Sequence, residues 1–478
     1  MHEDVECYPC KRIEWTTYTI QRKLYERRNL LLVLMVALAA YFVTFGQPEI
    51  ARRTITTFIF AAGCWIFEIF PLPITGLMIP VLLTIQGVFS PKDAFAPFSN
   101  SIIFLMIGGL VIGQSIKRHE LDKWIAYNLL INSKGRVDRL VFLIMFAAAF
   151  LSMWMSNTVA IAVILPVVLS IMAAMPEELV NLRKAMLLGA SISTSIGGMA
   201  MLTGSTPAMM AAALLGESRP FGFIQWAYYG LPVSLLSLII AFFILKLTFP
   251  YPKMRLNIDS IIEQKKQIDK LTAPQIKVIA IFTGTILLWF IGGHIEKWLG
   301  MPVSISSAAI ASILAVLTMF GTNLLDLKDL QSIQWELIFL VGGGILLGEA
   351  MIVSGAAGRV SNAIASFQGF APTIFILLLL SVVSLVLTNF ISNSATAAFL
   401  IPIALETTGF LGINPLPFVM AVALSATIAF ITPVGVPSTA LVYSTGQIPK
   451  EKLIKTGILI AIPTLFITLV VVWVLPIP

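Results

Sequence analysis

The chain alternates long apolar stretches with short polar or charged connections over almost its whole length. Eleven stretches are long enough to cross about 30 Å of hydrocarbon as helices. These predicted spans are 29–46, 54–69, 71–88, 101–116, 184–215, 225–249, 275–293, 302–320, 335–352, 414–445 and 453–476. Two further apolar stretches, 138–175 and 371–406, are long enough to enter the membrane and return. The pattern predicts an all-α polytopic membrane protein with about eleven transmembrane helices and two re-entrant hairpins.

A short polar phrase lies near the middle of each predicted hairpin. Ser156-Asn157-Thr158 interrupts the first hairpin, and Ser392-Asn393-Ser394 interrupts the second. A proline follows ten residues after the serine in both copies, at Pro166 and Pro402. One such phrase could simply join helices through hydrogen bonds, but polar residues at membrane depth are costly and mark functional sites. The matched pair favours two hairpin tips that build one polar site together.

The two halves of the chain resemble one another beyond these phrases. IFLMIGGLVIGQ at 103–114 parallels IFLVGGGILLGE at 338–349, an offset of 235 residues, and the two asparagines are offset by 236. Each repeat then holds five spans and one hairpin, and an odd number of crossings inverts the second repeat, as in many secondary transporters. The glycine runs within this parallel favour close helix packing. The predicted organisation is a basic tail (1–28), a first helix with the first repeat (29–249), a solvated cytoplasmic linker (250–274) and the second repeat (275–478).

Composition and charge agree with a membrane protein. Of 478 residues, 58% are hydrophobic and 12% are charged, with a mean hydropathy of +0.93, which exceeds what a soluble fold needs. The net charge of +7 follows topology and does not indicate nucleic acid. With a cytoplasmic N-terminus, the outside keeps six of the 31 basic residues, a strong positive-inside bias. Those six are Arg52, Arg53, Lys92, Arg219, Lys297 and Arg359. We therefore expect a plasma-membrane protein with an external C-terminus.

The polar N-terminal segment shows no cleavable signal, because its apolar run starts only at Leu30. Cys7 and Cys10 form a CxxC pair without a second pair, so two reduced thiols are favoured over a metal or redox site. Aromatic residues between the basic ones suggest an interfacial helix on the inner leaflet.

A second polar patch follows each hairpin. Thr203-Gly204-Ser205-Thr206-Pro207 interrupts the span 184–215, and the segment 432–439 interrupts the span 414–445. Glycine and proline in mid-span break a helix and free backbone groups, which is tolerated only against protein or a water-filled cavity. We therefore expect each hairpin tip to face a broken helix. Carbonyl, amide and hydroxyl oxygens there suit a sodium ion, while helix N-termini at the tips suit an anion.

These four polar segments contain no Lys, Arg or His, and no carboxylate lies near the tips, since Glu406 is beyond Pro402. Burying a divalent anion without compensation is very costly. An anionic substrate would therefore depend on co-bound cations and helix ends, which favours sodium coupling over proton coupling through an Asp or Glu.

With the twin Ser-Asn signatures and the broken helices, almost the whole chain after residue 29 resembles the divalent anion:sodium symporters, which carry dicarboxylates, tricarboxylates or sulfate. The resemblance implies a homodimer in which a transport domain slides as an elevator against a scaffold. It implies one sodium site at Ser152, Ser156, Asn157 and Gly204, and a second at Thr388, Ile391 (by its carbonyl), Asn393 and Gly435. The implied anion site comprises Ser156, Asn157, Thr158, Ser392, Asn393, Ser394 and Pro437.

Two departures from the family pattern lie beside the implied anion. Ser394 stands where the family usually has Thr, and the broken helices read GSTPA and GVPST where many dicarboxylate carriers have a Pro-Pro-Asn stretch. We expect sodium-coupled symport of a small divalent anion, with a four-carbon dicarboxylate favoured, sodium as coupling ion and no covalent cofactor. Sulfate or another oxyanion, and sodium-independent dicarboxylate exchange, remain alternatives. A channel is disfavoured by two hairpins that close one site, and an enzyme by the lack of a nucleophile–base set or metal cluster in the spans.

Overall fold

The computed structural model describes residues 10–216, 221–267, 270–299, 307–356, 373–433 and 435–475. Several sequence predictions fall outside these ranges. They concern Cys7, Arg219, Arg359, residues 302–306 and 371–372, and the last three residues.

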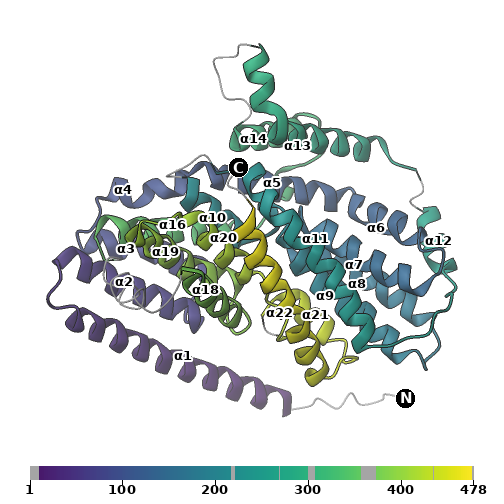
Figure 1. Ribbon diagram of the computed structural model, residues 1–478, viewed down its shortest axis with the longest axis horizontal. Coiled ribbons are helices and arrows are strands. Elements are labelled where there is room, and N and C mark those ends of the chain that lie inside the picture. The colour runs from purple at the N-terminus through teal and green to yellow at the C-terminus, as the bar shows by residue number, and fades with distance from the viewer. Residues whose placement is uncertain are drawn as a thin grey trace, which may run out of the picture.

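The described residues form helices and no β-strand (Figure 1). The longer helices are α1 (Cys10–Val43), α2 (Glu49–Ile66), α3 (Leu72–Ile85), α5 (Ser101–Arg118), α6 (Leu121–Ile131), α7 (Val137–Ser152), α8 (Asn157–Ala173), α9 (Val180–Gly198), α10 (Thr206–Gly216), α11 (Phe223–Thr248), α12 (Asp259–Gln267), α13 (Ala273–Leu299), α14 (Ala308–Gly321), α16 (Glu336–Val353), α18 (Thr373–Thr388), α19 (Asn393–Leu411), α20 (Pro415–Ala426) and α22 (Lys450–Val474). Short helical pieces are α4 (Pro91–Phe95), η1 (Ala96–Ser99), η2 (Leu202–Gly204), α15 (Leu327–Gln331) and α21 (Pro437–Tyr443).

Five helices in the described part of the chain are long and apolar enough to cross a membrane. They lie at Ser101–Arg118, Phe223–Thr248, Ala273–Ile291, Glu336–Val353 and Lys450–Val474. The other predicted spans are shorter, interrupted or less apolar helices, so the count of eleven crossings stays a prediction. Large side chains such as Phe243, Ile462 and Phe466 are exposed, as expected of helices whose outer solvent is lipid.

Two regions predicted as connections differ in the structure. Helix α1 begins at Cys10 and runs without a break for 34 residues, so from Cys10 onward the expected interfacial segment is continuous with the first span. The stretch after α5 contains helix α6, which packs on α7. Alternating apolar and charged side chains at helical spacing in LDKWIAYNLLI could have indicated this helix from the sequence.

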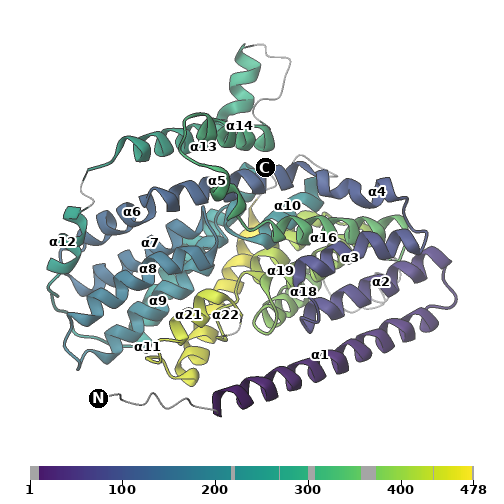
Figure 2. The same cartoon turned by 180° about the vertical axis from the view of Figure 1, so that it is seen from behind.

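Both chain halves place the same kinds of element in the same order. The pair α7–α8 is followed by the interrupted helix α9–α10 and the long helix α11. The pair α18–α19 is followed by the interrupted helix α20–α21 and the long helix α22. The packing also corresponds, because α5 packs on α14 while α16 packs on α3, and α8 packs on α21 while α19 packs on α10. Figures 1 and 2 show α7–α9 at one end of the molecule and α18–α19 toward the other.

The beginning of the linker is tied to the base of the first helix pair. The amide of Val137 donates to the carbonyl of Met254 at 3.3 Å, and the amide of Leu256 donates to the carbonyl of Gly135 at 2.8 Å. Lys246 forms an ion pair with Asp138 at 2.8 Å, and α12 packs on α6 and α8. The segment 250–274 is therefore partly a structural brace and not only a solvated connector.

Glycine permits the close approach of α3 and α16. A Cβ atom at Gly343 would lie 2.4 Å from the carbonyl oxygen of Gly76, and one at Gly76 would lie 2.4 Å from that of Phe339. Real Cβ atoms do not approach backbone this closely, so the two helices meet backbone to backbone. This contact confirms the close packing expected from the glycine runs.

Gly343→Ala should force α3 and α16 apart and destabilise the protein. Overpacking costs about 1–3 kcal/mol, while the gain in helix propensity returns up to about 1 kcal/mol, so the net loss should be about 1–2 kcal/mol. Thermal unfolding in detergent measures it. Gly284→Ala in α13 is the matched control, because a Cβ there meets nothing within 4 Å. Equal melting temperatures for the two variants would contradict the close-packing account.

Candidate functional site

The serines of the two polar phrases begin helices in the same way. Ser156 is the N-cap of α8 and accepts a hydrogen bond from the amide of Val159. Ser392 is the N-cap of α19 and accepts one from the amide of Ala395. Their backbones nearly coincide, with φ/ψ of −61/148° and −64/150°. Serine is a preferred N-cap because its hydroxyl satisfies an otherwise unpaired amide, so each phrase ends a turn and starts a helix.

Each asparagine is held by a hydroxyl from the preceding helix. Ser152 Oγ donates to Asn157 Oδ1 at 2.6 Å, and Thr388 Oγ1 lies 3.0 Å from Asn393 Oδ1 while also within hydrogen-bond distance of the carbonyl of Ala426. In both copies the partners are five residues apart. Ser152 and Thr388 are fully buried, so the two hydroxyls fix the orientation of the asparagine side chains from behind.

The broken helices are attached to these tips. Thr203 Oγ1 donates to the carbonyl of Met153 at 3.0 Å, and Thr432 Oγ1 donates to the carbonyl of Asn389 at 2.5 Å. Met153 and Asn389 follow Ser152 and Thr388 directly in the chain. Each tip therefore faces the break of the helix that follows it.

Asn389 is an important residue that the sequence reasoning did not identify. Its side chain donates to the carbonyls of Leu385 and Ile428, both at 2.8 Å, and accepts from the amide of Ile431 at 2.8 Å. It is 2% exposed. A buried amide of this kind supplies partners for the backbone groups that the break between α20 and α21 leaves without helical ones. Its position in the apolar run before Ser392 was the available signal.

Oxygen atoms crowd around a glycine in each break. A Cβ at Gly204 would lie 2.8 Å from the carbonyl oxygen of Gly198 and 2.9 Å from that of Ser152. A Cβ at Gly198 would lie 2.8 Å from Asn157 Oδ1. At Gly435, the carbonyl oxygens of Ala429 and Thr388 would lie at 2.5 Å and 3.4 Å from such an atom. Glycine keeps both oxygen clusters open, and clusters of carbonyl and amide oxygens suit hard cations.

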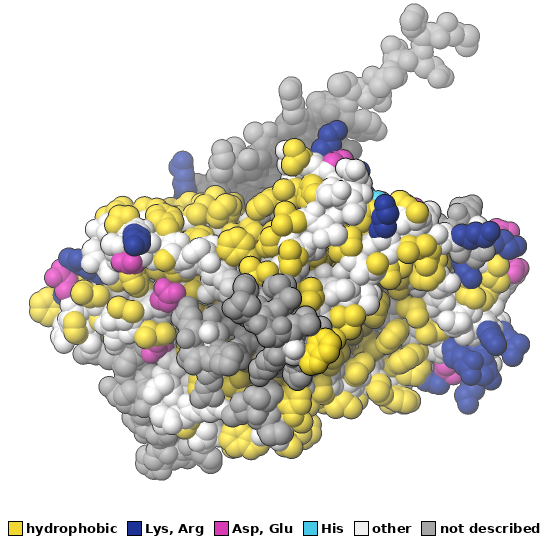
Figure 3. All heavy atoms as spheres, turned by 90° about the horizontal axis from the view of Figure 1, so that it is seen from above, with side chains coloured by type: hydrophobic (Ala, Val, Ile, Leu, Met, Phe, Trp, Pro, Cys, Tyr) yellow, Lys and Arg dark blue, Asp and Glu magenta, His cyan; other side chains and the backbone are white. Residues whose placement is uncertain are grey.

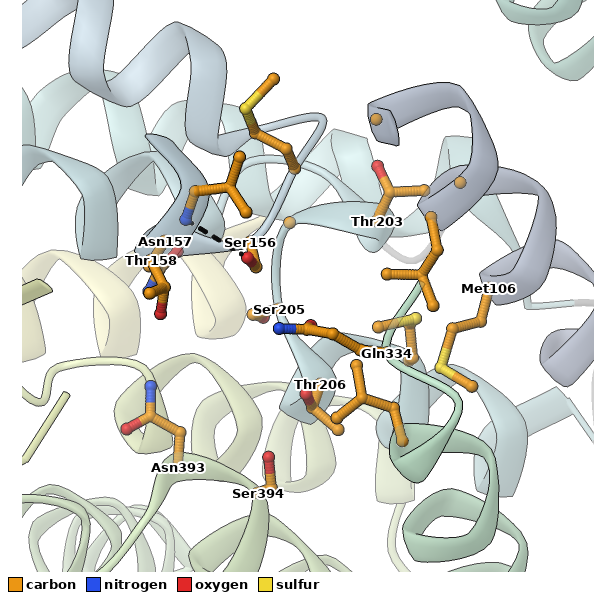
Figure 4. A pocket seen from close by; sticks show the side chains of 18 of the residues that line it. Met106, Ser156, Asn157, Thr158, Thr203, Ser205, Thr206, Gln334, Asn393 and Ser394 are labelled. Carbon is orange, nitrogen blue, oxygen red and sulfur yellow. Dashed lines mark hydrogen bonds between the residues drawn. The ribbon is translucent and has the colours of Figure 1, made fainter. Parts of the chain in front are cut away.

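The two tips and the two breaks meet at one pocket of about 480 Å³. Its lining includes all seven residues of the predicted anion site, Ser156, Asn157, Thr158, Ser392, Asn393, Ser394 and Pro437, together with Gly204 and Gly435. Figure 4 shows Asn157 and Thr158 facing Asn393 and Ser394 from opposite sides. Ser152, Thr388 and Ile391 are buried and do not line the pocket. Helices α8, α10 and α19 start at its wall, and their N-terminal amides carry partial positive charge.

Three of the lining residues that the predicted set lacked are of chemical interest. Ser205 is 8% exposed, and its Oγ has no hydrogen-bond partner among the described residues, as expected of a group that a ligand completes. Gln334, just before α16, points toward Ser205 in Figure 4. Lys117 lines the pocket from the last turn of α5. The sequence analysis considered only the tips and the breaks, which contain no basic residue, and so did not identify Lys117.

The distribution of side chains on the surface is also that of a membrane protein. Hydrophobic side chains cover much of the face in Figure 3, and Lys and Arg side chains gather at the end where Figure 1 places α6 and α12. A polar pocket between paired helix tips, inside a body with membrane-crossing helices, is typical of membrane carriers.

The chain belongs to the citrate transporter family, whose sequence profile matches residues 62–409. An uncharacterized transporter of Methanocaldococcus jannaschii is 35% identical, over 87% of this chain and 91% of the relative. The sodium-dependent dicarboxylate transporter SdcS of Staphylococcus saprophyticus is 26% identical, over 86% and 83% of the two chains. This similarity is consistent with the divalent anion:sodium symporters. The protein is therefore an integral membrane transporter of the citrate and dicarboxylate type and not an enzyme.

Solved structures share the fold at low identity. The YdaH transporter of Alcanivorax borkumensis superposes with a TM-score of 0.55 at 16% identity, over 84% of this chain and 90% of that one. MtrF of Neisseria gonorrhoeae gives 0.53 at 14% identity, over 84% and 86%. At this identity the comparison supports the fold alone.

Asn389→Ala should destabilise the break between α20 and α21. The change leaves the amide of Ile431 and the carbonyl of Ile428 buried without this partner, which should cost about 2 kcal/mol. Thermal unfolding in detergent measures the loss. Asn132→Ala is the matched control, because Asn132 is exposed and donates only to the carbonyl of Asn128. If Asn389→Ala melts like the control, Asn389 does not organise the break.

Proposed function

We propose that this protein is a secondary transporter for sodium-coupled symport of a small divalent anion across the cytoplasmic membrane, with a C4-dicarboxylate such as succinate, fumarate or malate favoured. The observation that carries the proposal is the pair of hydroxyl-oriented asparagines, Asn157 and Asn393, at two facing helix starts in one pocket. A sodium-dependent dicarboxylate transporter among the relatives supports the same substrate class.

The proposed anion site is the tip surface that faces the pocket. Ser156, Asn157, Thr158, Ser392, Asn393, Ser394 and Pro437 line it. Side-chain hydroxyls and amides can donate to carboxylate oxygens, and the N-termini of α8 and α19 favour negative charge. A pocket of about 480 Å³ lies within the usual range for small-molecule sites.

The proposed sodium sites lie behind this surface. Ser152, Ser156, Asn157 and Gly204 would supply one site. Thr388, Ile391 (by its carbonyl), Asn393 and Gly435 would supply the other. The oxygen clusters around Gly204 and Gly435 support these positions. Asn157 and Asn393 belong to both the anion and the sodium sets. A sodium ion bound on the side of each asparagine away from the pocket would hold its side chain in the orientation that contacts the anion.

We also propose that residues 29–249 and 275–478 contain inverted repeats joined by the linker 250–274. The corresponding order and packing of elements supports this. The hairpins α7–α8 and α18–α19 with their broken helices would form a moving transport domain, and α2, α3, α5, α14 and α16 a fixed scaffold. An elevator motion, a homodimer, a cytoplasmic N-terminus and an external C-terminus complete the proposal, and they rest on the family resemblance and the distribution of basic residues.

Two alternative transport functions are each supported by a feature of the pocket. The uncharged donors of the tips would also suit sulfate or another oxyanion. Sodium-independent dicarboxylate exchange calls for a fixed cation at the pocket, and Lys117 is one. Counterflow that ignores sodium would favour exchange.

Uptake of labelled succinate into proteoliposomes tests the proposal. We expect uptake to require an inward sodium gradient, and Asn157→Ala and Asn393→Ala each to reduce it at least tenfold, since each removes an amide whose Nδ2 would donate to the anion and whose Oδ1 would bind sodium. Asn181→Ala is the control, because Asn181 is exposed and bonds only the carbonyl of Pro250. Equal uptake in potassium would contradict sodium coupling, and full activity of both tip variants would place the site elsewhere.

Gly435→Ala should weaken sodium binding. The new methyl group would press on the carbonyl oxygen of Ala429 and displace it from the cluster. We expect the sodium concentration for half-maximal uptake to rise about tenfold or more. Gly409→Ala in α19 is the control, because a Cβ there meets nothing within 4 Å. An unchanged sodium requirement in Gly435→Ala would remove this cluster as a sodium site.

A further inference from the structure

One wall of the pocket comes from elements outside the two helix pairs and the two breaks. Helix α5 contributes one stripe of side chains at helical spacing, and the segment just before α16 contributes a second set. From α5 these are Met106, Gly109, Leu110, Gly113, Gln114 and Lys117. Because these residues follow the i, i+3, i+4, i+7, i+8 and i+11 pattern, Lys117 lies on the face of α5 that borders the rest of the pocket.

Lys117 is the one charged side chain among the described residues that line this pocket. It is exposed at the pocket mouth, and no hydrogen bond or ion pair joins it to another described residue. Its neighbour Arg118 differs, because it pairs with both Asp326 and Asp329. The chain therefore places two adjacent cations at the end of α5 and neutralises only the second.

The paired cation holds the wall in place. Asp329 also accepts a hydrogen bond from Gln114 at 3.4 Å, and His119 contacts the carbonyl of Leu324 at 2.8 Å. These contacts tie the end of α5 to the segment that leads through α15 to Gln334. Lys117 therefore extends from a helix end that these contacts hold in position.

Apart from Lys117, the described lining of the pocket offers a dianion only co-bound sodium ions, helix N-termini and uncharged donors. The tips carry no charged side chain, and each helix N-terminus contributes roughly half a unit of positive charge. A free ammonium group at the mouth of a cleft with low-dielectric walls attracts anions and raises their local concentration. The tip donors and Lys117 line different walls of the same pocket, which therefore offers donors to both ends of a two-ended anion.

We infer that Lys117 is an anion-binding residue that pairs with the negative group of the substrate nearest the mouth, while the tips hold the other end. This inference rests on the proposed function and adds to it a fixed cation on the α5 wall. Because α5 would belong to the scaffold, Lys117 contacts the anion only when the transport domain presents the site to this end of α5. In the expected topology that end is cytoplasmic, so the effect is confined to cytoplasmic binding.

Purified full-length protein titrated with succinate at saturating sodium tests the inference. Thermal shift reports the affinity for Lys117→Gln, Lys117→Arg and the control Lys123→Gln. Lys123, in the next helix α6, carries the same charge but pairs with Glu120 and does not line the pocket. We expect Lys117→Gln to weaken succinate binding about tenfold, which corresponds to about 1.4 kcal/mol. Lys117→Arg should stay within about threefold of the wild type, and Lys123→Gln should be unchanged.

Two further readouts separate binding from a structural role. The melting temperature without ligand and the sodium affinity without anion should be the same in Lys117→Gln and wild type. In oriented vesicles, the KM for succinate should rise on the cytoplasmic face only. Unchanged succinate affinity in Lys117→Gln, equal loss in Lys117→Arg, or an equal rise in KM on both faces would overturn the inference. Failure of the wild type to bind any dicarboxylate or sulfate would instead overturn the proposed function, and the Lys117 inference with it.

Discussion

Backbone groups freed inside an apolar body must find partners, and this constraint shapes the centre of the molecule. Two helix turns and two interrupted helices meet there, and each leaves amides or carbonyls that lipid cannot satisfy. Ser156 and Ser392 cap two of the helices that begin there. Thr203 and Thr432 bond backbone carbonyls of the facing turns. Asn389 bonds backbone groups across one break. Oxygens of the two breaks and the helix starts at the tips also border the pocket, so the groups that solve the structural problem also form the candidate binding site.

The two halves solve this problem with different residues. In the second half Asn389 bonds two backbone groups of the break, at Ile428 and Ile431, and one in α18, whereas Met153 stands at the corresponding position in the first half. The hydroxyl that orients the asparagine comes from Ser152 in one copy and Thr388 in the other. Thr158 and Ser394 likewise face one pocket with different side chains. The pocket is therefore pseudo-symmetric in its backbone but not in its side-chain donors. The two ends of a bound anion would meet different donors.

Much of this centre could be predicted from the sequence, because polar phrases in apolar stretches are conspicuous and their spacing repeats. The seven residues expected around the anion all line the pocket. The wall opposite could not be predicted in this way. Lys117 lies in an ordinary basic helix end, and Gln334 in a polar connection, so only the packing of α5 and α16 brings them to the tips. Helix α1 extends beyond its apolar run, because a helix can continue through polar residues outside the hydrocarbon. Hydrophobicity alone does not mark where such a helix begins.

The central claim is that anion and sodium bind at one site formed by the two tips, and thermodynamic linkage tests it most directly. Because the ions have opposite charge and would share Asn157 and Asn393, we expect each to raise the affinity for the other, and linkage requires the two factors to be equal. Equilibrium binding of radiolabelled sodium to the purified protein, measured with and without saturating succinate, gives this factor. The account predicts at least tenfold tighter sodium binding with succinate, matched by an equal effect of sodium on succinate. Sodium binding that is indifferent to the anion would contradict it.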